Sequence, residues 1–396
     1  MPRILRIINR LNLGGPTFNA AYLTKYMSPE YETMLVAGMI DGSEASSEFV
    51  LEEMGLKPVY IPEMYREIDW MKDRSAYFRL KKIIRDFKPD IVHTHAAKAG
   101  ALGRMAAYAC HVPVILHTFH GNVFHSYFSK WKTNVFINVE RQLAKRSTRI
   151  IAISEKQKRE LSEQFRICPA EKIEIIPLGF DLRKFSEDVE AKRKKFRDHY
   201  LVADDEIVIS IVGRLVPVKN HKLFLHALKN VISQTQKKVR AFIVGDGEDR
   251  LAIESLSRSL QIDFADFLHE KKKATLTFTS WLKDVDEVYA GSEIVALTSL
   301  NEGTPVSIIE ALAAGKPVVT TDVGGISDIM VNEKNGFIVN SNAQDAFTDA
   351  LLKLVEDTAL RGAMENFHGA NTSERFSYVR LVNDMSVLYS HLLQTR

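Results

Sequence analysis

The stretch "IVHTHAAKAGALGRMAAYACHVPVILHT", residues 91–118, reads as a strand, a helix and a second strand. Ile91–His95 and Val114–Thr118 are short apolar runs, and Ala99–Cys110 between them is an amphipathic helical stretch. Strands that alternate with helices pair in parallel, because the helix carries the chain back before the next strand begins. This unit therefore predicts an α/β fold on a parallel sheet that helices cover on both faces.

The same alternation continues on both sides of this unit, in two sets of strands. A charged stretch without a strand pattern, Glu187–Tyr200, separates the sets, and we place the linker there. The expected strands are Ile4–Ile8, Thr33–Gly38, Pro58–Ile61, Ile150–Ile153 and Lys172–Pro177 in the first set, and Ile207–Val212, Val239–Val244, Leu276–Phe278, Ile294–Leu297, Pro317–Thr321 and Gly336–Val339 in the second. We predict two Rossmann-like parallel-sheet domains, 1–190 and 201–375, that face each other across a cleft.

Composition narrows the class of protein. The chain has 396 residues, which is enough for two domains, and a formal net charge of only +3, which gives no bulk electrostatic case for nucleic acid. Cys110 and Cys168 lack CxxC spacing, which argues against a disulfide scaffold and for a reducing compartment. The N-terminus reads as a first strand, and no apolar run approaches the roughly 18 residues of a membrane helix. We therefore expect a cytoplasmic protein.

The stretch "NEGTPVSIIEALAAGKPVV", residues 301–319, predicts a buried helix. Thr304 is suited to cap it and Pro305 to occupy its first position, while Gly315 suits the left-handed exit. The residues between are apolar almost all round, so the helix lies inside the domain.

Two glutamates belong to this stretch. Glu310 lies on the buried helix and needs a partner, such as the two hydroxyls of a ribose or a distant arginine. Glu302 precedes the helix, where free N–H groups favour anions and where its carboxylate can accept hydrogen bonds from sugar hydroxyls. The alternative for Glu302 is a surface acid paired with the helix dipole.

A pair of cations follows the first strand of the second set. Gly213 and Arg214 directly follow the strand, and Lys219 comes five residues after Arg214. A guanidinium fork and a lysine point charge together suit a diphosphate. The alternative is that Arg214 and Lys219 are solvated loop cations without a ligand, which is common in proteins. The nearby "GDGEDR", residues 245–250, lacks the spacing of a dinucleotide fingerprint, which disfavours a nicotinamide dehydrogenase.

Side chains alternate along a strand, so His93 and His95 share one face. No third ligand stands at a suitable spacing, so packing at a strand end is favoured over a metal site. Lys98 opens the next helix and is expected to contact an acceptor or phosphate. Arg104 is expected on the helix surface.

The Glu302/Glu310 pair forms an E-x7-E pattern that resembles the signature of the retaining GT-B glycosyltransferases of family GT4. Other stretches resemble further blocks of that family in order: "IIPLGFDLRKF" (175–185), "IVGRLVPVKNH" (211–221), "IVGDGEDR" (243–250), "FTSWLKDVDEVYAGSEIVALTS" (278–299) and "TTDVGGISDIM" (320–330).

The resemblance implies a nucleotide-sugar donor bound by the domain 201–375, and a final helix, 376–396, that packs back on an acceptor-side domain, 1–190. It implies that Glu302 holds sugar hydroxyls and Glu310 the ribose, and that His120 in "HTFHGN" lies beside the reacting sugar. The expected donor-binding residues are Gly15, Gly213, Arg214, Lys219, Gly245, Ser280, Glu302, Gly303, Thr304, Pro305, Val306 and Glu310. The expected catalytic set is His120, Arg214, Lys219 and Glu302, and the expected acceptor contacts are Gly15, His95, Lys98 and His120.

The resemblance also implies retention of configuration by front-face substitution, without metal or cofactor, in which the leaving diphosphate helps to deprotonate the acceptor hydroxyl. "HTHAAKAG" with "HTFHGN" resembles surface-polysaccharide transferases, which suggests a lipid-linked saccharide acceptor. UDP is the expected nucleotide, with GDP and ADP open. The basic, aromatic segment 127–149 suits peripheral contact with an anionic membrane, or a core-facing aromatic stripe with a solvated face.

Two other functions stay open at this point. A nucleotide-sugar 2-epimerase would use cleft carboxylates and histidines on the same donor without an acceptor. A non-catalytic nucleotide-sugar-binding protein would bind the donor without turnover. The Glu302/Glu310 block with Arg214 and Lys219 favours a transferase over both.

Overall fold

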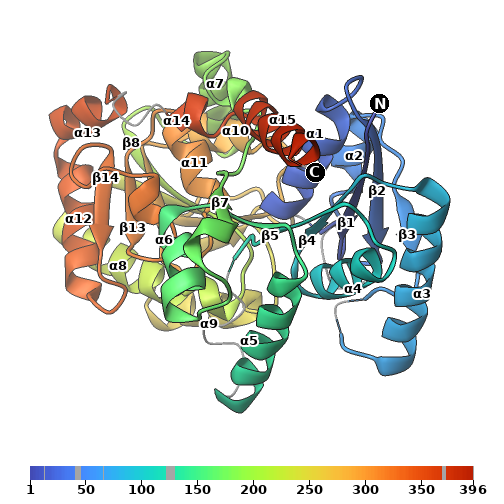
Figure 1. Ribbon diagram of the computed structural model, residues 1–396. Helices are drawn as coiled ribbons and strands as arrows, with labels where there is room; N and C mark the ends of the chain where they lie inside the picture. Colours follow the sequence, from blue (N-terminus) through green and yellow to red (C-terminus); the bar gives the residue numbers. More distant parts are fainter. Residues whose placement is uncertain (13, 41–45, 66, 122–129, 368–371, 396) are drawn as a thin grey trace. The chain divides into compact units, whose positions relative to one another are not determined.

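The computed structural model describes all residues except 13, 41–45, 66, 122–129, 368–371 and 396 (Figure 1). The chain forms two compact units, residues 1–180 with 375–396, and residues 181–374. Each unit is built around a seven-stranded sheet, and every strand pairing within the two sheets is parallel. The α/β prediction is confirmed.

The sheet of the first unit has the order β3-β2-β1-β4-β5-β6-β7. Its strands are β1 (Arg3–Ile8), β2 (Glu32–Gly38), β3 (Val59–Ile61), β4 (Ile91–His95), β5 (Val114–Thr118), β6 (Arg149–Ala152) and β7 (Ile173–Ile175). Its helices are α1 (Gly15–Tyr26), α2 (Glu48–Glu53), α3 (Trp70–Phe87), α4 (Ala97–Ala109), α5 (Lys130–Lys145), α6 (Glu155–Arg159) and α15 (Tyr378–Gln394). The short α14 (Thr372–Arg375) precedes α15.

Alternating side chains of this sheet pack against different helices. Ile4 of β1 belongs to a buried cluster with residues of α1 and α15, whereas Leu5 and Ile7 belong to one with residues of α3 and α4. Helices α3, α4 and α5 therefore cover one face, with α4 packed against both others, and α1 and α15 cover the opposite face.

The second unit repeats the design, with the strand order β10-β11-β9-β8-β12-β13-β14. Its strands are β8 (Glu206–Val212), β9 (Lys238–Val244), β10 (Phe264–Asp266), β11 (Leu276–Ser280), β12 (Ile294–Leu297), β13 (Val318–Thr321) and β14 (Gly336–Val339). Its helices are α7 (Val189–His199), α8 (His221–Gln234), α9 (Arg250–Ser259), α10 (Val285–Gly291), α11 (Val306–Ala313), α12 (Gln344–Glu356) and α13 (Thr358–Glu365). Strand β10 is not among the expected strands, because it holds an acidic residue and runs directly into the charged stretch that ends at Lys273, so it lacks an apolar run.

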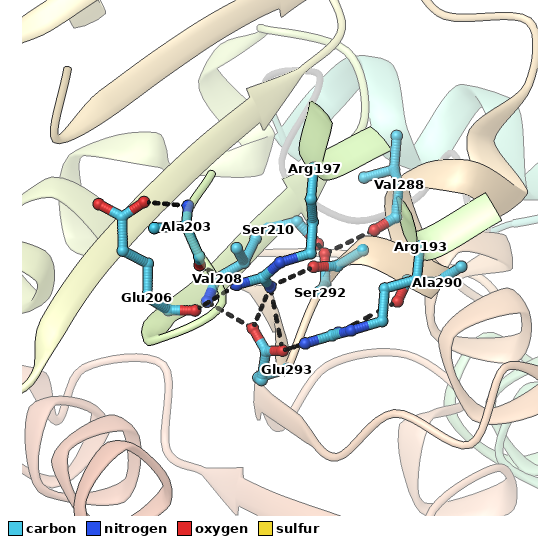
Figure 2. A network of polar contacts seen from close by, with 11 residues as sticks. Arg193, Arg197, Ala203, Glu206, Val208, Ser210, Val288, Ala290, Ser292 and Glu293 are labelled. Carbon is cyan, nitrogen blue, oxygen red and sulfur yellow. Dashed lines mark hydrogen bonds and ion pairs between the residues drawn. The ribbon is translucent and has the colours of Figure 1, made fainter. Parts of the chain in front are cut away.

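The expected linker, Glu187–Tyr200, is wrong, because most of it forms helix α7, and the units divide earlier, between Phe180 and Asp181. Figure 2 shows why α7 belongs to the second unit. Arg193 and Arg197 of α7 both bond to Glu293, at 2.5 and 3.2 Å, and Glu293 also accepts the backbone N–H of Val208 in β8 at 2.7 Å. The charges of the stretch thus fix a packed helix to the sheet and do not mark a solvated connection.

In each sheet the chain begins at a central strand, fills one side of the sheet and then crosses to the other. The reversal falls between β1 and β4 in the first unit, and between β8 and β12 in the second. Ligands of open parallel sheets bind beyond the strand ends at this point.

Candidate active site

The loops after β8 and β12 meet at the reversal point of the second sheet. The N–H of Leu300 donates to the carbonyl of Val218 at 2.8 Å, and the hydroxyl of Thr298 donates to the carbonyl of Lys219 at 2.9 Å. Thr321, at the end of β13, donates to the carbonyl of Ser299 at 2.6 Å. These bonds hold two of the predicted site residues, Lys219 and Glu302, on one small platform.

Lys219 and Glu302 form an ion pair on this platform. Lys219 Nζ lies 2.6 Å from Glu302 Oε1, and the hydroxyl of Ser299 donates to the same oxygen at 2.6 Å. Arg214, which follows β8, is exposed, and its side chain has no ion-pair or hydrogen-bond partner within the described residues. One cation is thus paired in the ligand-free protein, and the second is available to an incoming anion.

Helix α11 begins beside Glu302, one residue later than the sequence suggests. Pro305 keeps an extended backbone (ψ 113°) and is the N-cap, so Val306 is the first helical residue. Thr304 does not cap the helix, because it lies outside it. Its hydroxyl is buried without a hydrogen-bond partner within the described part of the chain.

The first turn of α11 consequently has free donors. The N–H groups of Ile308 and Ile309 donate to the carbonyl of Pro305. Those of Thr304, Val306 and Ser307 have no acceptor within the residues that the structure describes. Free N–H groups at a helix start, with the positive end of the helix dipole behind them, form a site for an anion.

Two glycines allow the site loops to approach one another. A Cβ at Gly245 (φ 132°) would lie 2.0 Å from the carbonyl oxygen of Gly213, and a Cβ at Gly324 (φ 55°) would lie 2.3 Å from that of Glu302. Ser280 supports the first contact, because its carbonyl accepts the N–H of Gly245 at 2.9 Å and its hydroxyl donates to Asp246 at 3.0 Å. Gly213, Gly245 and Ser280 are thus brought together.

Glu310, on α11, has a partner that the sequence does not suggest. The hydroxyl of Tyr289 on α10 donates to Glu310 Oε2 at 3.0 Å, and the ring of Tyr289 packs on Phe185 with centroids 5.6 Å apart. Burial raises the pKa of Glu310 to about 7, and the nearby Lys184 and the Tyr289 hydrogen bond oppose the shift. A distant arginine, the alternative to a ribose for this residue, is not its partner among the described residues.

Four histidines of the first unit gather where β4 and β5 end. His93 bonds to Tyr389 of α15 at 2.6 Å and to Thr118 at 2.7 Å, so its predicted role as a packed strand-end residue is confirmed. His117 bonds to Thr94 at 2.9 Å. Both are buried, and desolvation holds their pKa values well below the usual value.

The outer two histidines form a pair. His95 Nδ1 lies 2.9 Å from His120 Nε2, while His95 Nε2 and His120 Nδ1 are buried without partners among the described residues. Burial lowers the pKa of His120 to about 3, so the pair is neutral near pH 7. Gly15 begins α1, which follows β1. The three predicted residues Gly15, His95 and His120 therefore lie at or beyond the ends of neighbouring strands of one sheet.

One prediction about α4 is wrong, that of Arg104, and the expected ligand contact of Lys98 stays a prediction. Arg104 is fully buried, not on the surface, since its guanidinium bonds to Glu140 of α5 at 2.7 Å and to the carbonyl of Gly100 at 2.8 Å. Lys98 forms an ion pair with Asp73 of α3 and donates to the carbonyl of Glu67. Lys98 therefore joins two helices in the ligand-free protein.

Sequence reasoning missed Tyr289 and Ser299 as parts of the site. Tyr289 precedes Glu310 by 21 residues and reaches it only because α10 and α11 pack together. Ser299 ends the predicted block before Glu302, yet nothing local marks its hydroxyl as a ligand of that carboxylate. Among the described residues, no cluster of three or more metal-ligating side chains occurs, and none of the helices could cross a bilayer.

Comparisons with known proteins identify the class. Residues 14–184 match the family Glycosyltransferase Family 4, and residues 192–368 match Glycosyl transferases group 1. The chain therefore belongs to the family 4, group 1 glycosyltransferases, which are retaining enzymes of the GT-B fold. It is a nucleotide-sugar glycosyltransferase, and matches to transferase families in both halves favour this function over the epimerase and the non-catalytic alternative.

Particular relatives are similar over most of the chain. The UDP-Gal:α-D-GlcNAc-diphosphoundecaprenol α-1,3-galactosyltransferase of Escherichia coli is 31% identical over 84% of both chains. The capsular polysaccharide biosynthesis glycosyltransferase CapM of Staphylococcus aureus is 26% identical over 85% of both. Among solved structures, HepE of Anabaena in complex with UDP superposes with a TM-score of 0.79 at 20% identity, covering 98% of this chain and all of that one.

Proposed function

We propose that this glycosyltransferase transfers a hexosyl or N-acetylhexosaminyl group from a UDP-sugar to a lipid-linked saccharide, without a metal ion, in the synthesis of a surface polysaccharide or glycoconjugate. The proposal names the donor after the E. coli relative, which uses UDP-Gal and a diphosphoundecaprenol-linked acceptor. The observation that carries it is the platform on which Lys219, Glu302 and the uncapped start of α11 lie beside the unpaired Arg214.

The charges of this platform suit a leaving diphosphate. Arg214 and Lys219 supply two positive charges, and the start of α11 supplies the free N–H groups of Thr304, Val306 and Ser307 as backbone donors. When the diphosphate forms an ion pair with Lys219, the carboxylate of Glu302 becomes free to accept hydrogen bonds from hydroxyls of the donor sugar. Positive charge placed where negative charge develops lowers the barrier, which removes the need for a metal ion in this proposal.

The transfer proceeds on one face of the sugar. The bond from the anomeric carbon to the β-phosphate oxygen breaks, the acceptor oxygen bonds to the same face of that carbon, and the acceptor proton passes to the departing phosphate. Glu310 holds the ribose, Ser280 and Gly245 shape the nucleotide side, and His120, with His95 and Gly15, positions the sugar and the acceptor hydroxyl. The acceptor side is thus assigned to the first unit and the donor side to the second.

A binding and turnover experiment tests the proposal. Thermal shifts are measured with UDP, GDP, ADP and their common sugar conjugates, in EDTA, on the wild type and Arg214→Ala. A ligand that binds only the folded protein raises Tm, so UDP is expected to raise it for the wild type and much less for the variant. Transfer from the matching UDP-sugar to a diphospho-lipid-linked GlcNAc is then followed, and NMR of the product reports the anomeric configuration.

Each part of the proposal has its own contrary result. A shift with GDP or ADP alone would replace the donor base, and loss of turnover in EDTA that Mg²⁺ restores would remove metal independence. Transfer only to water-soluble saccharides would remove the lipid-linked acceptor.

A further inference from the structure

Two of the three tryptophans of this chain are largely exposed, and both lie in the first turn of a helix of the first unit. Trp70 begins α3 and is 88% exposed, and Trp131 lies in the first turn of α5 and is 73% exposed. Met71, next to Trp70, is 83% exposed. Burying such side chains in their own core would be favourable, so their exposure marks a surface that has a partner.

The apolar residues continue along one side of each helix. On α5, Trp131, Val135 and Val139 are exposed and four residues apart, which places them on one face. On α3, Met71 and Phe78 are exposed and seven residues apart, again on one face. We call the six side chains Trp70, Met71, Phe78, Trp131, Val135 and Val139 the α3–α5 surface.

Basic side chains border the apolar ones on α3. Arg74, Lys82 and Arg85 are exposed on the same outward side, and the guanidinium of Arg74 lies 5.8 Å from the ring of Phe78. Exposed acids are fewer there: Asp86 near the end of α3 and Glu67 just before it, while Asp73 is taken by Lys98. The helix therefore presents apolar and positive side chains together, the combination that suits anionic lipid head groups above acyl chains.

The α3–α5 surface reaches the edge of the sheet where the strands end. Lys98, three residues after β4, joins the first turn of α3 through Asp73, which places Trp70 at that edge. Asp69 caps α3 by accepting the N–H groups of Met71 and Lys72 at 3.0 Å, so the start of the helix is fixed.

We propose that the α3–α5 surface docks this enzyme on an anionic phospholipid bilayer, with Trp70 and Trp131 at the level of the head groups. The surface lies on the face of the sheet that α3, α4 and α5 cover, beside the strand-end edge that carries His95 and His120. A lipid-linked acceptor, whose saccharide extends from the bilayer, would then reach this edge without leaving its membrane. This last step rests on the proposed function, whereas the docking itself does not.

Vesicle flotation tests the docking. Vesicles of equal parts phosphatidylglycerol and phosphatidylcholine are compared with pure phosphatidylcholine, at low and at high NaCl. We expect the wild type to float with the anionic vesicles and to be released by salt, because screening weakens the contact with head groups. The variant Trp70→Ser/Trp131→Ser should lose at least about tenfold in partitioning, and Arg74→Ala/Arg85→Ala should lose binding to anionic vesicles.

The matched control is Val387→Ser on α15, which is 63% exposed on the opposite face and should float like the wild type. Equal loss in this control, or flotation of the tryptophan variant at the wild-type level, would overturn the proposal. So would a concentration-dependent dimer, seen by light scattering, that disappears in the tryptophan variant while vesicles bind neither protein.

The UDP-induced thermal shift of the same proteins separates this inference from the proposed function. The residues proposed to hold the diphosphate and the ribose, Arg214, Lys219 and Glu310, belong to the second unit. The tryptophan variant should therefore keep the full UDP-induced shift. Flotation without transfer to a lipid-linked acceptor would remove the proposed acceptor and leave the docking supported. Transfer to that acceptor in detergent, with no flotation, would support the proposed acceptor and remove the docking.

Discussion

At the scale of the residue, Glu310 and Tyr289 show how one hydrogen bond orients a buried carboxylate. Glu310 lies on an otherwise apolar helix, and the Tyr289 hydroxyl donates to one of its oxygens at 3.0 Å. In the proposed function, the carboxylate is thereby oriented before the ribose binds. Phe185, against which Tyr289 packs, lies five residues beyond the boundary between the two units.

Glu310→Gln should change stability in a pH-dependent way. Burial raises the pKa of Glu310 from 4.5 to about 7, so its protonated form is the one that favours folding. This contribution is complete below the unfolded pKa and is lost as the pH rises through about 7. Glutamine keeps an oxygen for Tyr289 and cannot ionise. We expect the ligand-free variant to melt about 2–6 °C above the wild type at pH 8 and close to it at pH 5.

Differential scanning fluorimetry at both pH values checks this expectation, with the exposed Glu248→Gln as the control. A gain at pH 5 that equals the gain at pH 8 would mean that ionisation of Glu310 is not its source.

Tyr289→Phe should weaken UDP binding and leave turnover at saturating donor nearly unchanged. The ring keeps its contact with Phe185, but Glu310 loses the donor that orients it. We expect Kd for UDP and KM for the donor to rise about 3- to 10-fold, in line with the loss of one hydrogen bond of about 1 kcal/mol. A fall in kcat with unchanged KM would show that Tyr289 acts on the chemical step instead.

At the scale of the element, helices α11 and α15 have roles that their length and place in the sequence do not indicate. Helix α11 has only eight residues, yet its uncapped first turn supplies the free N–H groups of the donor platform. Helix α15, at the other end of the sequence, completes the first unit: Leu381, Met385 and Leu392 are buried in its core, and Tyr389 bonds to His93.

Tyr389→Phe should destabilise the first unit. The substitution removes the hydroxyl that lies 2.6 Å from His93 Nδ1 and leaves that nitrogen without a partner in the interior. An unsatisfied buried group costs about 1–3 kcal/mol, which chemical denaturation resolves. Tyr378→Phe is the control, because the hydroxyl of Tyr378 makes no hydrogen bond within the described residues. Equal stability of the two variants would contradict this role of Tyr389.

At the scale of the whole molecule, the residues proposed to act belong to two compact units. His95 and His120 belong to the first, and Arg214, Lys219, Glu302 and Glu310 belong to the second. Each group lies at the strand ends around the reversal point of its own sheet. Binding of the nucleotide and transfer to the acceptor should therefore be separable by mutation.

Arg214→Ala and His120→Ala should separate these two steps. Arg214→Ala is expected to lose the UDP-induced shift and about 10²–10³ in kcat/KM, because charge on the leaving diphosphate is no longer stabilised. His120→Ala should keep the UDP shift of the wild type and lose transfer, since UDP carries no sugar for it to contact. The exposed His269→Ala is the control. Loss of UDP binding in His120→Ala would place that residue on the nucleotide instead.

The sequence by itself determined the two α/β units, nearly all of their strands and the family. It could do so because apolar runs and helical periodicity are local properties, and because "NEGTPVSIIEALAAG" and its neighbours are continuous motifs. It also predicted that Lys219 and Glu302 belong to one site, and the structure places their charged atoms 2.6 Å apart.

Only the tertiary structure decided which charged residues are buried or paired. Arg104 was expected on the surface and is buried against Glu140. Lys98 pairs with Asp73, a partner that the sequence does not indicate, and the charges of 187–200 fasten a helix to its sheet. It also supplied Tyr289 as the partner of Glu310. The reason is physical: the environment of a charge depends on side chains from distant parts of the chain, and no local pattern of residues records which of them arrive beside it.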